Sequence, residues 1–201
     1  MTDITKYIKQ QGGYATMKGL KEAKYQTRDI RKYVNQNMIE KVKPGLYRLP
    51  DTGFYKNVNL SFVDACNAIP TGVICLGSAI NYYNLSTYNP REIHIAVLNS
   101  EKPVKIIYPP VKFYYFRKNQ YETGIEIIKT KYGDIRIYDI EKTICDIFRF
   151  RNEYGDEIAL ESLRNYTKRK DADYNKLRRY SKICRVYSII NPYLKGLIAM
   201  S

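Results

Sequence analysis

The stretch over residues 14–50, YATMKGLKEAKYQTRDIRKYVNQNMIEKVKPGLYRLP, predicts the fold of the N-terminal part of the chain. Apolar residues recur at helical spacing in 17–23 and again in 28–36, and a short turn separates the two runs. A β-hairpin follows, with strands predicted over 39–43 and 46–49 around a Pro44-Gly45 tip. The predicted order is therefore helix, turn, helix and hairpin.

That order is typical of a winged helix-turn-helix, which places its second helix in the major groove of DNA and its hairpin over the backbone. In the second helix the inward positions, such as Ile30 and Val34, are apolar, so the polar and basic positions face outward. Arginine suits bidentate contact with guanine, and glutamine suits adenine. We therefore expect base contacts from Gln26, Arg28 and Arg31.

Other residues of the same stretch are better placed for phosphate contacts. Lys41, Lys43 and Arg48 alternate along the hairpin strands, so we expect them to share one face that gives affinity rather than sequence choice. The alternative is an ordinary solvated face, as charge runs usually are. The full set of predicted DNA-binding residues is Thr16, Lys18, Tyr25, Gln26, Thr27, Arg28, Arg31, Lys32, Lys41, Lys43 and Arg48.

The charge of the chain suggests a polyanionic partner, with nucleic acid as the first candidate. The net charge is +14. An AT-rich genome, which encodes lysine-rich proteins, would be enough to explain that total. It would not explain the distribution, because residues 1–59 carry 12 Lys and Arg against 5 Asp and Glu, residues 60–150 carry 11 against 9, and residues 151–201 carry 11 against 6. The C-terminal excess predicts either a solvated face or a second basic surface on flanking DNA, formed by Arg164, Lys168, Arg169, Lys170, Arg178, Arg179 and Lys182.

The remaining sequence predicts a second domain of α+β class. Residues 51–59 have the composition of a linker, which gives a winged helix-turn-helix domain over 1–50 and an α+β domain over 60–201. Strand patterns at 92–98, 104–107, 112–116, 125–130 and 134–138 precede a run of helices from residue 140 to residue 200.

Cysteine and histidine usage argues against a metal site or another cofactor. The four cysteines are scattered and His94 is the only histidine, whereas zinc ligands are usually paired at short spacing. Reduced thiols fit a cytoplasmic protein. A mean hydropathy of -0.48, without an 18-residue apolar run or a secretory h-region, predicts neither a transmembrane helix nor a signal peptide.

Acidic residues near the start of the helical run do not form a convincing catalytic cluster. We expect Asp139 to be a helix N-cap, Glu141 and Lys142 to lie on the surface of the first turn, and Asp146 to pair with Lys142 or Arg149. His94 alternates with isoleucines and is predicted to be a satisfied or surface histidine rather than a base. The chain is therefore predicted not to be an enzyme, with no catalytic residues.

Three segments resemble the AbiEi-type antitoxins, the regulators of type IV abortive-infection toxin–antitoxin pairs. Residues 12–50 resemble the winged helix-turn-helix of that family. Residues 75–97, CLGSAINYYNLSTYNPREIHIAV, resemble its S-A-L-x-x-x-x-L segment and the strand after it. Residues 134–166 contain YDIEKTICD, which is similar to its Y-D-x-E-[KR]-T-x-x-D helix and is the most specific piece.

The resemblance implies a function that the residues alone do not. It implies a cytoplasmic phage-defence antitoxin that represses its own operon by binding inverted repeats in the promoter. The second domain would counteract a partner toxin with nucleotidyltransferase-like chemistry, without a stable complex between the two proteins. The alternative is a protein-interaction module that sequesters its toxin directly.

Overall fold

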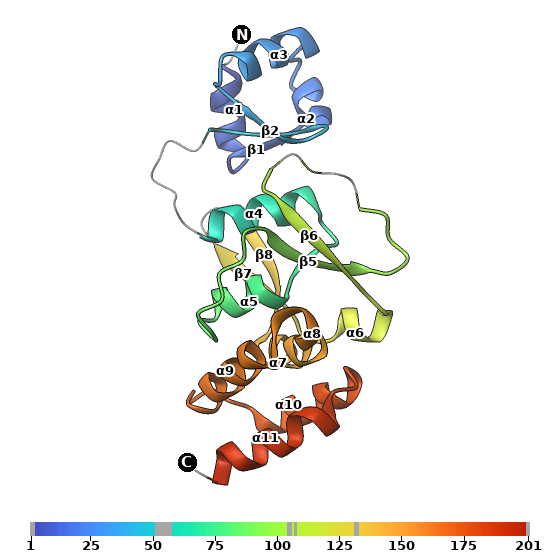
Figure 1. Cartoon of the computed structure of the whole chain (residues 1–201). Coiled ribbons are helices and arrows are strands. Elements are labelled where there is room, and N and C mark those ends of the chain that lie inside the picture. The colour runs from blue at the N-terminus through green and yellow to red at the C-terminus, as the bar shows by residue number, and fades with distance from the viewer. Residues whose placement is uncertain (1–2, 51–57, 104–105, 107, 131–132, 200–201) are drawn as a thin grey trace. The chain divides into compact units, whose positions relative to one another are not determined.

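The computed structural model describes residues 3–50, 58–103, 106, 108–130 and 133–199 (Figure 1). This described part contains eleven helices and two β-sheets, which confirms the predicted α+β class. The chain divides into two compact units, one of Met1–Pro70, Pro103–Val111 and Lys129–Ile135, the other of Thr71–Lys102, Lys112–Ile128 and Arg136–Ser201. Most of the predicted linker over 51–59 lies outside the described residues, so the predicted domain boundaries stay predictions.

The N-terminal part of the first unit packs three helices on a three-stranded sheet. The helices are α1 (Ile4–Gln10), α2 (Met17–Glu22) and α3 (Thr27–Asn35), and the strands β1 (Tyr14–Thr16), β2 (Glu40–Lys43) and β3 (Leu46–Arg48) lie in the order β1-β3-β2. The helices and strands predicted within residues 14–50 are confirmed to within one residue. One apolar core joins these elements, and its buried members are Ile4, Ile8, Ala15, Leu20, Tyr25, Ile30, Ile39 and Tyr47.

Left-handed backbone marks the points at which this chain reverses. Lys24 (φ 68°) follows α2 and Asn37 (φ 54°) follows α3. Gly45 (φ 80°) forms the tip of the β2–β3 hairpin, where glycine adopts positive φ without steric cost. The carbonyl of Gly45 accepts a hydrogen bond from the N–H of Met17 (2.7 Å), which fixes the hairpin tip to the start of α2. The first unit also contains α4 (Val58–Ala68).

A five-stranded mixed sheet forms the centre of the α+β fold. Its strands are β4 (Val73–Ile74), β5 (Ile93–Leu98), β6 (Val111–Phe116), β7 (Ile125–Thr130) and β8 (Gly133–Tyr138), in the order β6-β5-β4-β8-β7. The short β4 pairs antiparallel with β5 and parallel with β8. The strands predicted from residues 92, 112, 125 and 134 onward are confirmed to within one residue, whereas most of 104–107 lies outside the described residues.

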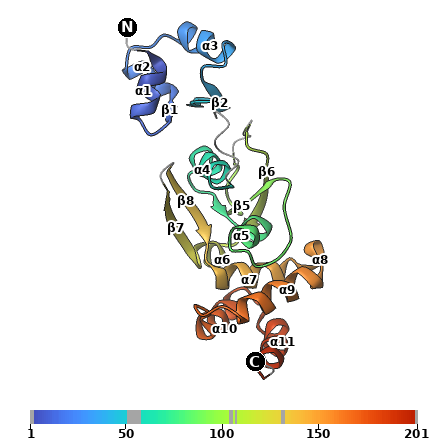
Figure 2. The same ribbon diagram turned by 90° about the vertical axis from the view of Figure 1, so that its left-hand side faces the viewer.

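Helices complete the second unit, and α7 is central among them (Figure 2). They are α5 (Leu76–Tyr82), α6 (Lys118–Glu122), α7 (Ile140–Arg149), α8 (Arg151–Tyr154), α9 (Asp156–Thr167), α10 (Tyr174–Ile183) and α11 (Tyr187–Ala199). Helix α7 packs against α5, α9 and α10, and eight of its residues are buried. A continuous apolar core that includes Phe116, Tyr138, Ile144 and Leu163 joins these helices to the sheet.

Candidate nucleic-acid interface

Helix α3 turns its basic residues toward solvent. Arg28, Arg31 and Lys32 are exposed, whereas Ile30 is fully buried in the N-terminal core. The helical repeat explains this division, because apolar residues at 30, 33 and 34 occupy one stripe and leave the charged positions outside it. None of the three cations forms an ion pair with a residue that the structure describes. Their charges are therefore available to an external anion.

The first residues of α2 and α3 carry other members of the predicted set. Gln26 is the exposed N-cap of α3, but its side chain makes no capping hydrogen bond, so its amide is uncommitted. Thr27 is half-buried beside it. Thr16 caps α2 by accepting the N–H of Gly19 (3.1 Å), so its hydroxyl already has a structural role. Lys18 is 87% exposed at its side chain and lies 3.9 Å from Glu22, a pair that solvent weakens.

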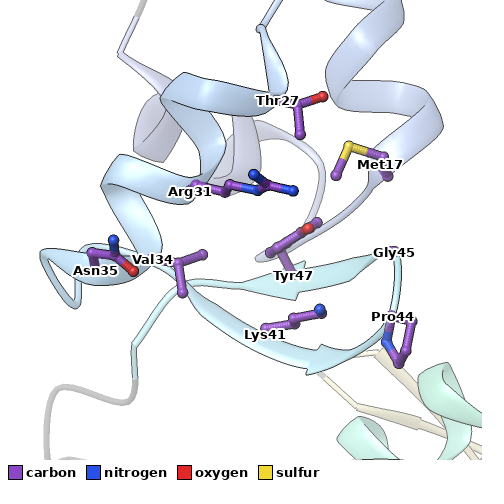
Figure 3. Close-up of a pocket in the computed structure, with 9 residues that line it drawn as sticks. All are labelled: Met17, Thr27, Arg31, Val34, Asn35, Lys41, Pro44, Gly45 and Tyr47. Carbon is purple, nitrogen blue, oxygen red and sulfur yellow. The ribbon is translucent and has the colours of Figure 1, made fainter.

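An open pocket of about 330 Å³ separates α3 from the β2–β3 hairpin (Figure 3). Arg31 reaches into it from α3 and Lys41 from β2, and the ring of Tyr47 lies between them. Burial raises the pKa of Tyr47, and the charge of Arg31 partly opposes that rise, which reflects how near the guanidinium is to the ring. The remaining lining residues are Met17, Thr27, Val34, Asn35, Pro44 and Gly45.

The expectation that three hairpin cations share one face is wrong. In the register Glu40 lies opposite Arg48 and Lys41 lies opposite Tyr47, so Lys41 and Arg48 point to opposite faces. A bulge between Lys41 and Lys43 then pairs Lys43 with Leu46. An extra residue of this kind reverses the side-chain alternation, which places Lys43 on the face of Arg48. Only Lys41 is directed toward the pocket beside α3.

Arg48 is buried and paired within the first unit, which contradicts the exposed position on the hairpin expected for it. Its side chain is 9% exposed and forms ion pairs with the fully buried Asp64 of α4 and with Glu40 (2.6 Å). Asp64 also accepts the hydroxyl of Tyr14 (2.6 Å), and the Arg48 guanidinium lies 5.0 Å from the ring centre of Tyr108. Arg48 therefore ties β3 to α4. Lys43 acts similarly, donating to the carbonyl of Ala68 (2.7 Å).

Tyr25 is the second residue of the predicted set that is buried rather than exposed. Its side chain is 6% exposed and belongs to the N-terminal core, where its ring centre lies 5.8 Å from that of Tyr7. The reversal at Lys24 explains this direction, because it turns the following residue back toward α2, and the N–H of Tyr25 bonds to the carbonyl of Leu20 (3.0 Å). The turn residue is thus part of the core rather than of the surface.

The predicted C-terminal basic residues are mostly exposed but do not behave as one group. Arg169 forms a bidentate pair with Asp171, with both N–O distances at 2.9 Å. Arg164 lies beside α11 in a separate groove. The other members are exposed residues of α10 and of the segment before it, namely Lys168, Lys170, Arg178, Arg179 and Lys182.

The groove beside Arg164 lies between α9 and α11 and has a volume of about 560 Å³. Its apolar lining comes from Leu160, Pro192, Tyr193, Gly196 and Leu197, and Tyr193 is 46% exposed. Two carboxylates one helical turn apart, Glu157 and Glu161, stand along it. Neither this groove nor the pocket beside α3 was expected from sequence, because each depends on how two elements pack.

The charged residues at the start and middle of α7, Asp139, Glu141, Lys142 and Asp146, form a buried network rather than a surface. Asp139 accepts the N–H of Lys142 (2.8 Å), which confirms the predicted N-cap. The surface position expected for Glu141 and Lys142 is wrong, since they are 5% and 0% exposed. The Lys142 ammonium lies 2.5 Å from the carboxylate of Asp146, one of the two pairings expected for that residue, and both side chains are fully buried. Burial raises the pKa of Asp146 despite the nearby ammonium.

Lys176 of α10 closes the outer end of this network. Its ammonium lies 3.1 Å from a carboxylate oxygen of Asp139 and 3.0 Å from one of Glu141. The hydroxyl of Tyr166 on α9 donates to Glu141 (3.0 Å). Asp139, Glu141, Lys142, Asp146 and Lys176 each have a partner, and the network joins α7, α9 and α10. Arg149, the last residue of α7, is outside it, and its Nη1 is buried without a hydrogen-bond partner among the described residues.

His94 is buried beside three tyrosines, Tyr88, Tyr114 and Tyr154. It is 4% exposed, and its Nδ1 lies 2.8 Å from the hydroxyl of Tyr154. That hydroxyl contacts Tyr114 (2.8 Å), which donates to Glu153 (2.6 Å). Burial, together with the charge of Lys112, lowers the pKa of His94 to about 4. The prediction of a satisfied histidine agrees with these contacts.

Within the described residues no three His, Cys, Asp or Glu side chains are grouped so that they could hold a metal ion. The same part of the chain contains no helix long and apolar enough to cross a membrane. Comparison of the sequence with protein-family models and with curated proteins gives no match.

Proposed function

We propose that the chain is a transcriptional repressor that binds double-stranded DNA through a winged helix-turn-helix formed by α2, α3 and the β2–β3 hairpin. The observation that carries this proposal is the set of exposed, unpaired cations on two adjacent elements, with Arg28, Arg31 and Lys32 on α3 and Lys41 on β2. In a winged helix these elements face the major groove and the backbone of the same duplex. A strongly basic chain favours such a ligand.

From exposure and pairing we infer different roles for the members of this surface. Arg28 and Arg31 are exposed on the helix that enters the groove, so they are the base-reading residues, with Gln26 at the helix start. Lys32 and Lys41 contact phosphates, together with Lys18. Exposed cations of α10 and of the segment before it extend the contact to flanking DNA. Arg48, Lys43 and Tyr25 support the fold instead.

The resemblance to AbiEi-type antitoxins extends the proposal to a cytoplasmic antitoxin that represses its own toxin–antitoxin operon. The chain would bind inverted repeats in the promoter, and the α+β domain predicted over 60–201 would counteract a nucleotidyltransferase-like toxin. This extension requires that a downstream open reading frame in the genome encodes such a toxin.

The test is a gel shift with the full chain and a duplex from its own promoter. The double variant Arg28→Ala, Arg31→Ala should lose about 1–3 kcal/mol of binding free energy for each base contact removed. The matched control is Lys6→Ala, Lys9→Ala, which removes the same charge from exposed positions of α1. Equal affinity of wild type and the α3 variant would rule out α3 as the reading helix.

The second candidate function is direct sequestration of the toxin, and the groove between α9 and α11 favours it. Leu160, Tyr193 and Leu197 offer apolar surface, and Glu157 and Glu161 fit a partner helix that carries basic residues. Co-purification of the chain with the product of the downstream gene as a stable complex, lost in Tyr193→Ala, would favour this function. Repression without a stable complex would favour the antitoxin proposal above.

A further inference from the structure

Strand β6 has aromatic residues on both of its faces, and only one face is used by the core. Tyr114 and Phe116 are 5% and 0% exposed and belong to the main core of the second unit. Phe113 and Tyr115 alternate with them and point the other way, where Phe113 is half-buried and Tyr115 is 52% exposed. Packing of the core accounts for the first pair but not for the second.

A cation, Arg117, directly follows the exposed face of β6. Arg117 follows the strand with an extended backbone (φ -71°, ψ 152°), so it stands on the side of Phe113 and Tyr115, and it is exposed. It has no ionic partner among the described residues. The stretch Lys112–Lys118, KFYYFRK, contains no carboxylate, but Lys112 lies 2.5 Å from Glu153 and Lys118 lies 4.0 Å from Glu122, so Arg117 is its cation without an ionic partner in the described part of the chain. Because β6 is the first strand in the sheet order, this face lies at an edge of the sheet, where an extended ligand has access.

We propose that Phe113, Tyr115 and Arg117 form a stacking face for single-stranded nucleic acid, separate from the duplex-binding surface of α3. Side chains two residues apart on a strand are about 6.6 Å apart, which leaves room for one base on each ring. Bases stack on such rings whatever their sequence, and an adjacent arginine holds the backbone phosphate. The face would therefore bind single strands with little sequence preference.

The experiment measures fluorescence anisotropy of labelled oligouridylate and oligothymidylate, each of about 15 nucleotides, with the full chain. Tyr115→Leu should weaken binding about fivefold or more, because it removes the ring and keeps an apolar side chain. Tyr115→Phe should bind as wild type, because the ring is retained. Arg117→Gln should flatten the salt dependence. A preference for oligouridylate would assign the face to RNA, and equal affinity would assign it to single strands of either sugar.

The matched control is Tyr193→Leu, which removes another tyrosine of similar exposure from α11. It should leave single-strand binding unchanged, and Tyr115→Leu should leave binding of the promoter duplex unchanged. Conversely, Arg28→Ala, Arg31→Ala should lose the duplex and keep the single strand, so this inference and the proposed function can fail independently. Absence of single-strand binding, or its loss in Tyr193→Leu or in the α3 variant as much as in Tyr115→Leu, would overturn the assignment.

Discussion

Charged residues of the same types occupy opposite environments in α3 and α7. On α3 Arg28, Arg31 and Lys32 are exposed, and no described residue neutralises them. On α7 Lys142 and Asp146 are fully buried at 2.5 Å from one another. A buried charge must have a partner, because its desolvation costs several kcal/mol, whereas an exposed charge needs none. Residue type therefore does not separate a binding surface from a structural network, but burial and pairing do.

The largest effect in this comparison should come from breaking the buried pair of α7. Lys142→Met keeps much of the side-chain volume and leaves the Asp146 carboxylate without its ammonium. We expect a loss of about 3–5 kcal/mol in the free energy of unfolding, the cost of an uncompensated buried charge. Urea unfolding followed by circular dichroism measures it.

Two further variants test whether charge is the cause. Lys168→Met removes an exposed lysine and should change the free energy of unfolding by less than about 0.5 kcal/mol. The double variant Lys142→Met, Asp146→Leu should regain much of the loss, because it removes both buried charges. If Lys142→Met cost no more than Lys168→Met, the buried pair would not contribute to stability.

Arg48 should behave like the buried residues of α7, although strand alternation predicts it to lie with the exposed cations. Arg48→Met should destabilise the chain by about 3 kcal/mol, near the low end for a broken buried pair, because Glu40 is half-exposed and Asp64 keeps the Tyr14 hydroxyl. In gel shifts at a temperature at which the variant is folded, Arg48→Met should weaken DNA binding less than Arg31→Ala does. If Arg48→Met weakened DNA binding more than Arg31→Ala did, Arg48 would belong to the DNA-binding surface.

Local patterns predicted the helices and strands within residues 14–50 well, because each signal is contained in a few residues. The apolar stripe through Ile30 and Val34 gives the direction of α3, and Gly45 gives the hairpin tip. The predictions that failed concern residues whose environment is set by contacts with residues distant in sequence. Arg48 is buried by Asp64, sixteen residues away, and the strand alternation could not show the bulge at Val42.

The prediction that Glu141 and Lys142 of α7 lie on the surface failed for a related reason. Helical spacing correctly gave Asp139 as the N-cap and Asp146 as a neighbour of Lys142. It could not show that the helix is covered on several sides, because α5, α9 and α10 come from separate segments. An amphipathic pattern shows one buried face, and here the charged positions are also covered and are satisfied by Lys176 and Tyr166.

A smaller loss in the free energy of unfolding is expected at acidic pH, because of the buried His94. Its pKa is lowered from 6.5 to about 4, so between these values the unfolded chain binds a proton that the folded chain does not. Above about pH 7 both states are neutral and the group has no effect, and stability falls as the pH drops through 6.5 toward 4. At pH 5 the loss should be about 2 kcal/mol.

Comparison of unfolding free energies at pH 7 and pH 5 between wild type and His94→Gln isolates this loss from that of the carboxylates. The charged groups facing the ring, Lys112 and Glu153, remain in both proteins. Wild type should lose about 2 kcal/mol more than His94→Gln between the two pH values. An equal loss in the two proteins would show that His94 titrates normally in the folded state.

The smallest effect separates two lysines of the same strand, Lys41 and Lys43. Lys41 is exposed at the pocket beside α3, so Lys41→Gln should weaken binding to all duplexes alike and reduce the slope of log affinity against log salt by about 0.9, one phosphate contact. Lys43 donates to the Ala68 carbonyl, so Lys43→Gln should keep the wild-type slope and cost about 1 kcal/mol of stability. Gel shifts over a salt series measure both slopes. Equal slopes for the two variants would mean that the hairpin register does not decide which lysine meets DNA.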